Sequence, residues 1–244
     1  MKWTRIVYFC YTDDMTKYGQ YCPVARATEI LGDRWTLLIV RDLIYGARHF
    51  KALERGLPGI PTAMLSNRLK RLQQAGIIER EEESGSQKVS YSLTPAGKAL
   101  VPIMDGLSEW GAQWVFGEPA ETELDPVLLL WWMHSRVYRE RLPKQRVVVE
   151  FDFWETRPAR FWLVLTREDV SVCQTHPGYE VDVLVTAELK SFYQVWLGKI
   201  AFMDAVNSGN VELDALPAYI RDFPGWFMLS PFAEAVQSAS RSHA

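Results

Sequence analysis

The sequence predicts an α+β protein made of two domains, and three observations support that prediction. The chain has 244 residues, a length that suits two modest domains with a core each. In the first half the apolar residues change from helical spacing to strand spacing and back, whereas the second half runs through several strand-like segments before two helices. A stretch rich in Gly, Pro and Glu begins near Gly117 and separates the halves.

The composition is that of an ordinary globular protein, with 48% hydrophobic and 23% charged residues. These fractions exclude a disordered or fibrous chain. The net charge of −3, taken alone, argues against a nucleic-acid binder. Residues 1–117, however, carry 15 Lys+Arg and 12 Asp+Glu, a net of +3, and residues 118–244 carry 12 and 18, a net of −6. The two halves are therefore expected to face different partners.

Cysteine usage and hydropathy predict a cytoplasmic protein. Cys10, Cys22 and Cys173 are widely spaced and odd in number, so they cannot form an intrachain disulfide framework, which points to a reducing compartment. The start lacks the pattern of a secretory signal, and the longest apolar run, residues 126–133, is too short to span a bilayer. We therefore expect no membrane association.

Four segments of the first half are expected to be helices, because apolar residues recur on one face of each and glycines end most of them. They are residues 22–31, 34–44, 50–55 and 62–74. Asp33 is suited to cap the second helix, and alternating residues at 77–81 and 88–93 predict a hairpin. Thr94-Pro95 then opens a closing helix. Helices, hairpin and closing helix in this order predict a winged helix-turn-helix, a DNA-binding fold.

The helix at 62–74 is the predicted reader of DNA. If Leu65, Leu69 and Leu72 face the core, the opposite side is short, polar and basic, and no acid is expected to neutralise it. Asn can pair with adenine, while Arg and Lys contact guanine or phosphate. The residues of this helix predicted to meet DNA are Thr62, Ser66, Asn67, Arg68, Lys70 and Arg71. The alternative is an ordinary solvated helix face.

Phosphate contacts outside that helix are predicted at Arg48, Lys51 and Lys88. Arg48 and Lys51 lie near the start of the short helix, and Lys88 follows the hairpin loop. The acids before the hairpin tip repel phosphate, so the hairpin is expected to contribute little. These acids are Glu79, Glu81, Glu82 and Glu83.

Residues 22–114 resemble the HxlR family of bacterial winged-helix regulators, relatives of the MarR family. The matching segments are Cys22-Pro23-Val24, LGDRWTLLI at 31–39, Arg48-His49-Phe50, Gly59-Ile60-Pro61, LSNRLKRL at 65–72, Gly76-Ile77 and YSLTPAG at 91–97. One departure is Pro61, where the family usually has a Ser or Thr cap, a role that Thr62 is then expected to take. The resemblance implies a homodimer that pairs through its terminal helices and binds a pseudo-palindromic double-stranded DNA operator. The closing helix carries a stripe of apolar residues on one face: Leu100, Ile103, Leu107, Trp110 and Trp114. This stripe would form part of the dimer surface, or else pack on its own domain.

The same resemblance suggests a separate role for Cys22, since some regulators of this type sense electrophiles or oxidants through a cysteine at the matching position. A helix start can lower the pKa of a thiol and so favour the thiolate. The second cysteine that some such sensors use for a disulfide switch has no match in this chain. A purely structural role for Cys22 is therefore the alternative.

The second half, after a linker at residues 118–125, predicts a helix over 127–139 that begins after Asp125-Pro126, followed by half-buried antiparallel strands. The strands are expected at 146–154, 160–166, 170–174 and 181–185, with helices at 187–197 and 200–207 and a strand at 210–213. This order resembles the sterol-carrier-protein-like fold, an α/β sandwich with an antiparallel or mixed sheet and an apolar tunnel. The matching segments are VDVLVTA at 181–187, Leu197-Gly198-Lys199 and NSGNVEL at 207–213.

Six of the ten tryptophans fall in the second half, together with many phenylalanines. Any one of them is more simply a core residue, but so many large rings favour an apolar pocket for a small hydrophobic effector. A neutral or cationic effector is expected because this half is acidic. The predicted lining is Trp131, Phe151, Phe153, Phe161, Leu163, Phe192, Trp196, Phe202 and Trp226.

The sequence contains no catalytic constellation, metal-ligand cluster or cofactor motif, so neither an enzyme nor a cofactor is expected. The chain is predicted to be a one-component transcriptional regulator. Its parts are an arm at 1–20, a winged-helix domain at 21–117, a ligand-binding domain at 126–232 and a flexible tail at 233–244. The alternatives are a redox sensor acting through Cys22, a lipid carrier that uses its first half only to dimerise, and a second domain that serves only dimerisation.

Overall fold

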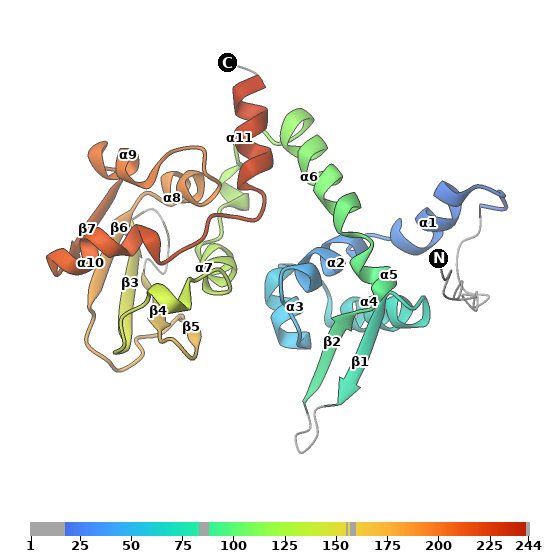
Figure 1. Ribbon diagram of the computed structural model, residues 1–244, viewed down its shortest axis with the longest axis horizontal. Coiled ribbons are helices and arrows are strands. Elements are labelled where there is room, and N and C mark those ends of the chain that lie inside the picture. Colours follow the sequence, from blue (N-terminus) through green and yellow to red (C-terminus); the bar gives the residue numbers. More distant parts are fainter. Residues whose placement is uncertain (1–17, 83–87, 155, 157–159, 243–244) are drawn as a thin grey trace. The chain divides into compact units, whose positions relative to one another are not determined.

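The computed structural model describes residues 18–82, 88–154, 156 and 160–242, and the chain separates into two compact units, Met1–Leu107 and Ser108–Ala244 (Figure 1). The first unit combines helices with a two-stranded hairpin, and the second is built on a five-stranded sheet. Each unit has its own buried hydrophobic core, as expected of the α+β class. Within the described ranges, no helix is long and apolar enough to cross a membrane.

The first unit has the order of helices and strands that the sequence predicts. Its elements are α1 (Pro23–Leu31), α2 (Thr36–Ile44), α3 (Phe50–Gly56), α4 (Thr62–Gln74), β1 (Ile78–Glu82), β2 (Val89–Leu93), α5 (Pro95–Lys98) and α6 (Val101–Trp114), which continues into the second unit. β1 and β2 pair antiparallel. Leu53, Leu65 and Leu72 are among the side chains that fill the core. The arrangement is a winged helix-turn-helix.

The turn between α1 and α2 differs from the prediction. α2 begins at Thr36 rather than at residue 34, and Asp33 does not cap it. Trp35 occupies the N-cap position with a left-handed backbone, φ 77°. Such a conformation costs about 1–3 kcal/mol in a residue other than glycine, so surrounding contacts must hold it. The carboxylate of Asp33 is left available for residues of another helix.

The closing helix is interrupted after its first turn. Thr94 caps α5 as predicted, since its hydroxyl oxygen accepts a hydrogen bond from Gly97 N at 3.1 Å. α5 then ends at Lys98, and α6 starts at Val101. Gly97 lies so close to the carbonyl oxygen of Ile77 that a Cβ would overlap it. A glycine at this position therefore lets the short helix approach the start of the hairpin.

A buried carboxyl group lies inside the helix-turn-helix, in α2. One oxygen of Asp42 accepts a hydrogen bond from Arg41 Nε at 2.8 Å, and the other has no hydrogen-bond partner among the described residues. Burial, which outweighs the opposing effect of Arg41, raises the pKa of Asp42 to about 6. The ionised form of this group is thus less favourable in the folded protein than in the unfolded chain.

The stability of the protein is expected to fall as the pH rises through the titration of Asp42. Because its pKa is higher in the folded state, this group stabilises the fold fully below the unfolded pKa and loses that contribution as the pH rises through about 6. Relative to Asp42→Asn, the free energy of unfolding of the parent should drop by about 2 kcal/mol between roughly pH 4 and pH 7, measured with urea. A difference that does not change with pH would contradict the raised pKa.

The second unit places helices against a mixed sheet. Its elements are α7 (Pro126–His134), β3 (Val147–Phe153), β4 (Arg160–Leu165), β5 (Val170–Cys173), β6 (Val183–Ala187), α8 (Leu189–Trp196), α9 (Phe202–Asn207), β7 (Val211–Ala215), α10 (Pro217–Asp222) and α11 (Ala233–Ser242), with 3-10 turns at Glu121–Glu123, Arg139–Arg141 and Phe223–Gly225. Asp125 caps α7 by accepting from Val127 N at 2.8 Å. α7 ends at His134, earlier than the sequence predicts.

The strands of this sheet follow the order β5-β4-β3-β6-β7. β3 and β6 are parallel, and the other neighbours are antiparallel. The prediction of antiparallel, half-buried strands is therefore wrong at the centre, where Val148 and Val149 of β3 are both inaccessible to solvent. A strand that is buried on both faces does not alternate between apolar and polar residues, so its sequence does not show whether it pairs parallel or antiparallel. A mixed sheet is one of the two sheet types that the sterol-carrier resemblance implies. The resemblance itself stays a prediction.

The last described residues form a helix where the sequence predicts a flexible tail. α11 buries Ala233, Val236 and Ala239 on one side. Gln237 Nε2 donates a hydrogen bond to Gly198 O at 3.0 Å, which ties α11 to the turn after α8. The small side chains that suggested disorder instead allow this helix to pack closely.

Candidate nucleic-acid interface

α4 divides into a buried side and an exposed side. Leu65, Leu69 and Leu72 are at most 2% exposed and belong to the core of the first unit. The opposite side carries exposed polar residues: Thr62, Ser66, Asn67, Lys70, Gln73 and Gln74. The predicted division of the two faces is confirmed. Donors and acceptors that could reach the edges of DNA bases thus come from successive turns of one helix.

Arg68 and Arg71 of α4 are held by an acid from outside the helix. Asp33 Oδ2 accepts hydrogen bonds from Arg68 Nη1 at 2.6 Å and from Arg71 Nη1 at 2.7 Å. Arg68 Nε also donates to Arg34 O at 3.3 Å, and the Arg68 side chain is only 12% exposed. The expectation that no acid neutralises this helix is therefore wrong, because the acid comes from the turn between α1 and α2. We call Asp33, Arg68 and Arg71 the Asp33 clamp.

A second polar network holds the start of α4. Glu54 of α3 accepts hydrogen bonds from Lys51 Nζ and from Thr62 Oγ1, both at 2.8 Å. The hydrogen bond from Lys51, and then that from Thr62, lower the pKa of the Glu54 carboxyl. The prediction that Thr62 caps α4 is wrong, because Pro61 is the N-cap residue and no side chain caps the helix. The network instead fixes α3 to the first turn of the helix expected to meet DNA.

The hairpin is joined to the residues that precede α3. Tyr91 N donates to Arg48 O at 2.7 Å, and His49 Nδ1 lies 3.1 Å from Val89 O. Arg48 and Lys88 expose their side chains, as a phosphate contact requires. Of the acids that precede the hairpin tip, the structure describes Glu79, Glu81 and Glu82, and all three are exposed. Glu83 falls outside the described residues.

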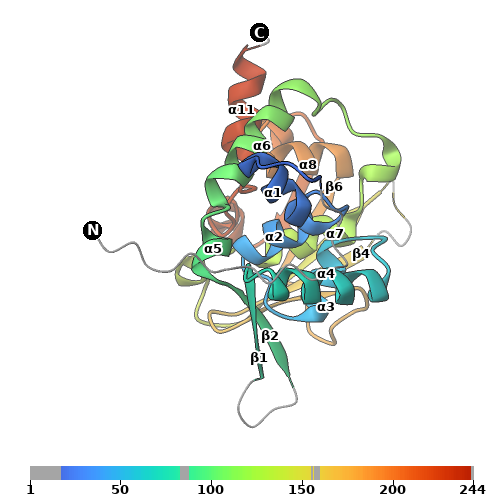
Figure 2. The same cartoon turned by 90° about the vertical axis from the view of Figure 1, so that its right-hand side faces the viewer.

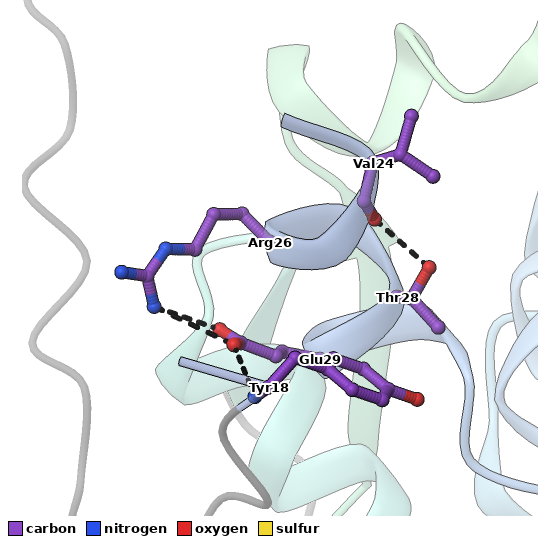
Figure 3. Close-up of polar contacts among 5 residues, drawn as sticks. All are labelled: Tyr18, Val24, Arg26, Thr28 and Glu29. Carbon is purple, nitrogen blue, oxygen red and sulfur yellow. Dashed lines mark hydrogen bonds and ion pairs between the residues drawn. The ribbon is translucent and has the colours of Figure 1, made fainter. Parts of the chain in front are cut away.

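α1 carries a buried acid that fixes the residues before it. The side chain of Glu29 is inaccessible to solvent and accepts hydrogen bonds from Tyr18 N at 2.9 Å and from Arg26 Nη1 at 3.1 Å (Figure 3). Cys22 is the N-cap residue of α1, half-buried and without a capping hydrogen bond from its side chain. Its proposed redox role stays a prediction. The arm predicted at residues 1–20 lies mostly outside the described residues.

Most of the aromatic residues predicted to line a ligand pocket fill the core of the second unit. Phe151, Phe153, Phe161, Leu163, Phe192, Trp196 and Trp226 are at most 4% exposed. The ring centroid of Phe192 lies 5.6 Å from that of Phe151 and 5.8 Å from that of Phe153. Trp131 and Phe202 are half-buried. These contacts are those of core residues, the simpler interpretation of each ring, and the effector pocket stays a prediction.

Sequence reasoning missed both polar networks around α4. The only signal was spacing: Arg68 and Arg71 are three residues apart, so they share a helix face and can bind one acid. The identity of that acid depends on the path of the chain between distant helices. No group of three or more His, Cys, Asp or Glu that could hold a metal occurs within residues 18–82, 88–154 and 160–242. The site is thus a helix face supported by ion pairs.

The first unit has the features of a winged helix-turn-helix DNA-binding protein: a helix with a buried leucine side and an exposed polar side, followed by a hairpin. A model of the family described as HxlR-like helix-turn-helix matches residues 30–118. The chain belongs to this family of DNA-binding transcriptional regulators. The matched residues end before the sheet of the second unit.

Relatives match the same region. The uncharacterized HTH-type transcriptional regulator YvaP of Bacillus subtilis (strain 168) is 38% identical over 99 residues, which cover 40% of this chain and 92% of the relative. The uncharacterized HTH-type transcriptional regulator sll1512 of Synechocystis is 32% identical over 113 residues, which cover 46% of this chain and 84% of the relative. Among solved structures, the reduced form of the transcriptional regulator YodB from B. subtilis is 36% identical, with a TM-score of 0.36, and the match covers 39% of this chain and 96% of that one.

Proposed function

We propose that this regulator binds a twofold-symmetric operator as a homodimer, with α4 of each copy in a major groove. The observation that carries the proposal is the exposed polar side of α4 opposite its buried leucines. An α-helix fits the major groove of B-form DNA, where each base pair presents a distinct pattern of donors and acceptors. Two such helices related by twofold symmetry would meet half-sites one turn of DNA apart.

The side chains of the proposed interface have different roles. Asn67 is placed to pair with a base edge, with Ser66 and Thr62 beside it. Lys70 is exposed on the same helix, and we assign it to phosphate or guanine. Arg68, by contrast, is largely buried in the Asp33 clamp, and we assign it a positioning role. The residues assigned to phosphate are Arg71 on α4 and, outside that helix, Arg48, Lys51 and Lys88.

The stripe on α6 supports the proposed dimer. Leu100 is buried in its own unit, but Ile103, Leu107, Trp110 and Trp114 are all exposed in the single chain. Large apolar side chains that share one helix face and remain exposed are typical of a surface that another protein covers. A second copy of α6 is the partner that symmetry supplies.

Lys70→Ala is expected to weaken operator binding and to reduce its salt dependence. The plot of log affinity against log salt has a negative slope, and each lost phosphate contact makes it shallower by about 0.9. Arg68→Ala should weaken binding with the slope unchanged, because Asp33 already neutralises this guanidinium. Fluorescence anisotropy at several salt concentrations measures both quantities, and Lys144→Ala, at an exposed position of the second unit, is the control. If Lys70→Ala binds with the affinity and slope of the control, Lys70 does not contact DNA.

A further inference from the structure

A groove lies between the C-terminal end of α6 and α11, within the second unit. Figure 1 and Figure 2 both show these two segments side by side. The groove is open to solvent and has a volume of about 440 Å³, which suits a small organic molecule. Its walls include the apolar residues Trp114, Val115, Phe116, Val236 and Ala239, together with Lys199.

One wall of this groove carries a cation, Lys199. Lys190 Nζ lies 2.8 Å from Glu118 Oε2, whereas Lys199 Nζ lies 3.8 Å from Glu118 Oε1, beyond hydrogen-bond distance. The hydrogen bond from Lys190 lowers the pKa of Glu118, so the carboxylate is ionised at neutral pH. Lys190 has the shorter contact with Glu118 and is also close enough to Glu188 to feel its charge, so acids balance Lys190 and Lys199 is the cation left at the groove. Lys199 Nζ, 5.4 Å from the ring centroid of Phe116, keeps hydrogen-bond donors for another anion.

The two walls of the groove are fastened to each other. The Gln237 side chain on α11 donates to Gly198 O at 3.0 Å, at the residue that precedes Lys199. Gly198 has a φ of +70°, and a Cβ there would overlap the Gln237 amide. Lys199 N in turn donates to Gln194 O at 2.9 Å, which anchors the turn to α8. The backbone turn that carries Lys199 and the apolar wall of α11 are thus fixed to each other.

We propose that this groove binds a small amphipathic carboxylate, with its flat apolar body against Phe116 and Val236 and its carboxylate paired with Lys199. Charge complementarity argues for an anion, and the aromatic walls argue for a flat apolar body. The net charge of −6 on residues 118–244 predicts a neutral or cationic ligand, but the charged side chain that lines the groove is a cation, Lys199. The site is separate from the aromatic core, and binding there does not depend on DNA recognition.

The probes for this proposal are 2-naphthoate and 2-naphthalenemethanol, which share a ring system and differ in charge. Isothermal titration calorimetry on the full chain should show 2-naphthoate binding about tenfold more tightly than the alcohol. Lys199→Gln should remove that tenfold difference and leave the weak binding of the alcohol unchanged. Lys144→Gln, which removes the same charge at an exposed site away from the groove, should bind as the parent does.

A second pair of variants tests the place of binding without changing charge. Ser240 lines the groove and Ser238 does not, although both are exposed on α11. Ser240→Trp should abolish binding of both probes, and Ser238→Trp should not. The proposal is overturned if the parent binds neither probe, if Lys199→Gln binds 2-naphthoate as Lys144→Gln does, or if Ser240→Trp binds as Ser238→Trp does. Circular dichroism establishes that each variant is folded.

Discussion

Replacing Leu107 with glutamate is expected to convert the proposed dimer into monomers and to lower operator affinity on the order of a hundredfold or more. Leu107 is 43% exposed on α6, between Ile103 at 49% and Trp110 at 57%. Association would bury these side chains, and a carboxylate among them would lose its hydration without gaining a partner. Because each copy contributes one reading helix, a monomer would hold only half of the operator. Sedimentation velocity and anisotropy measure the two effects separately.

Gln113→Glu is the control for this experiment, because it adds the same charge to an exposed position of α6 outside the stripe. It should leave the dimer intact. If Leu107→Glu remains dimeric with the affinity of the parent, the stripe is not the dimer surface. If its main effect were a lower free energy of unfolding of the single chain, the stripe would instead pack on its own domain, the alternative that the sequence left open.

Asp33→Asn is expected to lower both stability and operator affinity. Asp33 holds two guanidinium groups at 2.6 and 2.7 Å, and the Arg68 side chain is only 12% exposed. Removing the carboxylate leaves a largely buried cation without its partner, which we expect to cost about 2 kcal/mol of unfolding free energy, less than for a fully buried pair because Asp33 is partly exposed. Operator affinity should fall about tenfold as α4 loses its anchor, with an unchanged salt slope. Urea denaturation and anisotropy provide the two readouts.

A double-mutant cycle separates this anchoring from other effects of Asp33. In the Arg68→Ala background, Asp33→Asn should cost much less stability than it does in the parent, because the partner is already absent. An increase in operator affinity and salt slope in Asp33→Asn would mean that the clamp withholds its arginines from phosphate. That result would contradict the positioning role.

The features that the sequence predicts well depend on local periodicity. The leucine stripe and the following Gly76 predict a helix at residues 62–74, and α4 occupies Thr62–Gln74. The cap at Thr94 is equally local, because the hydroxyl bonds a backbone group three residues away. Helix identity, hairpin position and the faces of α4 could therefore be derived from residues close together in the chain.

The features that the sequence does not reveal depend on contacts between distant residues. From its local sequence, Asp33 is predicted to cap the helix that begins at Arg34. Its carboxylate instead accepts hydrogen bonds from Arg68 and Arg71, which lie 35 and 38 residues away in the chain. The parallel pairing of β3 with β6 joins strands that are separated by a hairpin and a loop, and no local pattern records it. α11 has a composition of small residues that resembles a frayed tail, and the hydrogen bond that ties it to the turn after α8 joins Gln237 to Gly198, 39 residues away.

The proposal that α4 reads DNA bases as part of a symmetric dimer can be tested by selecting binding sites from a random duplex library. The parent should select an inverted repeat. Asn67→Ala should select a repeat of the same spacing but lose preference at one symmetry-related pair of base pairs, since a lost base contact costs about 1–3 kcal/mol of discrimination. Selection of the same sequence by both proteins, or of no inverted repeat by the parent, would contradict the claim.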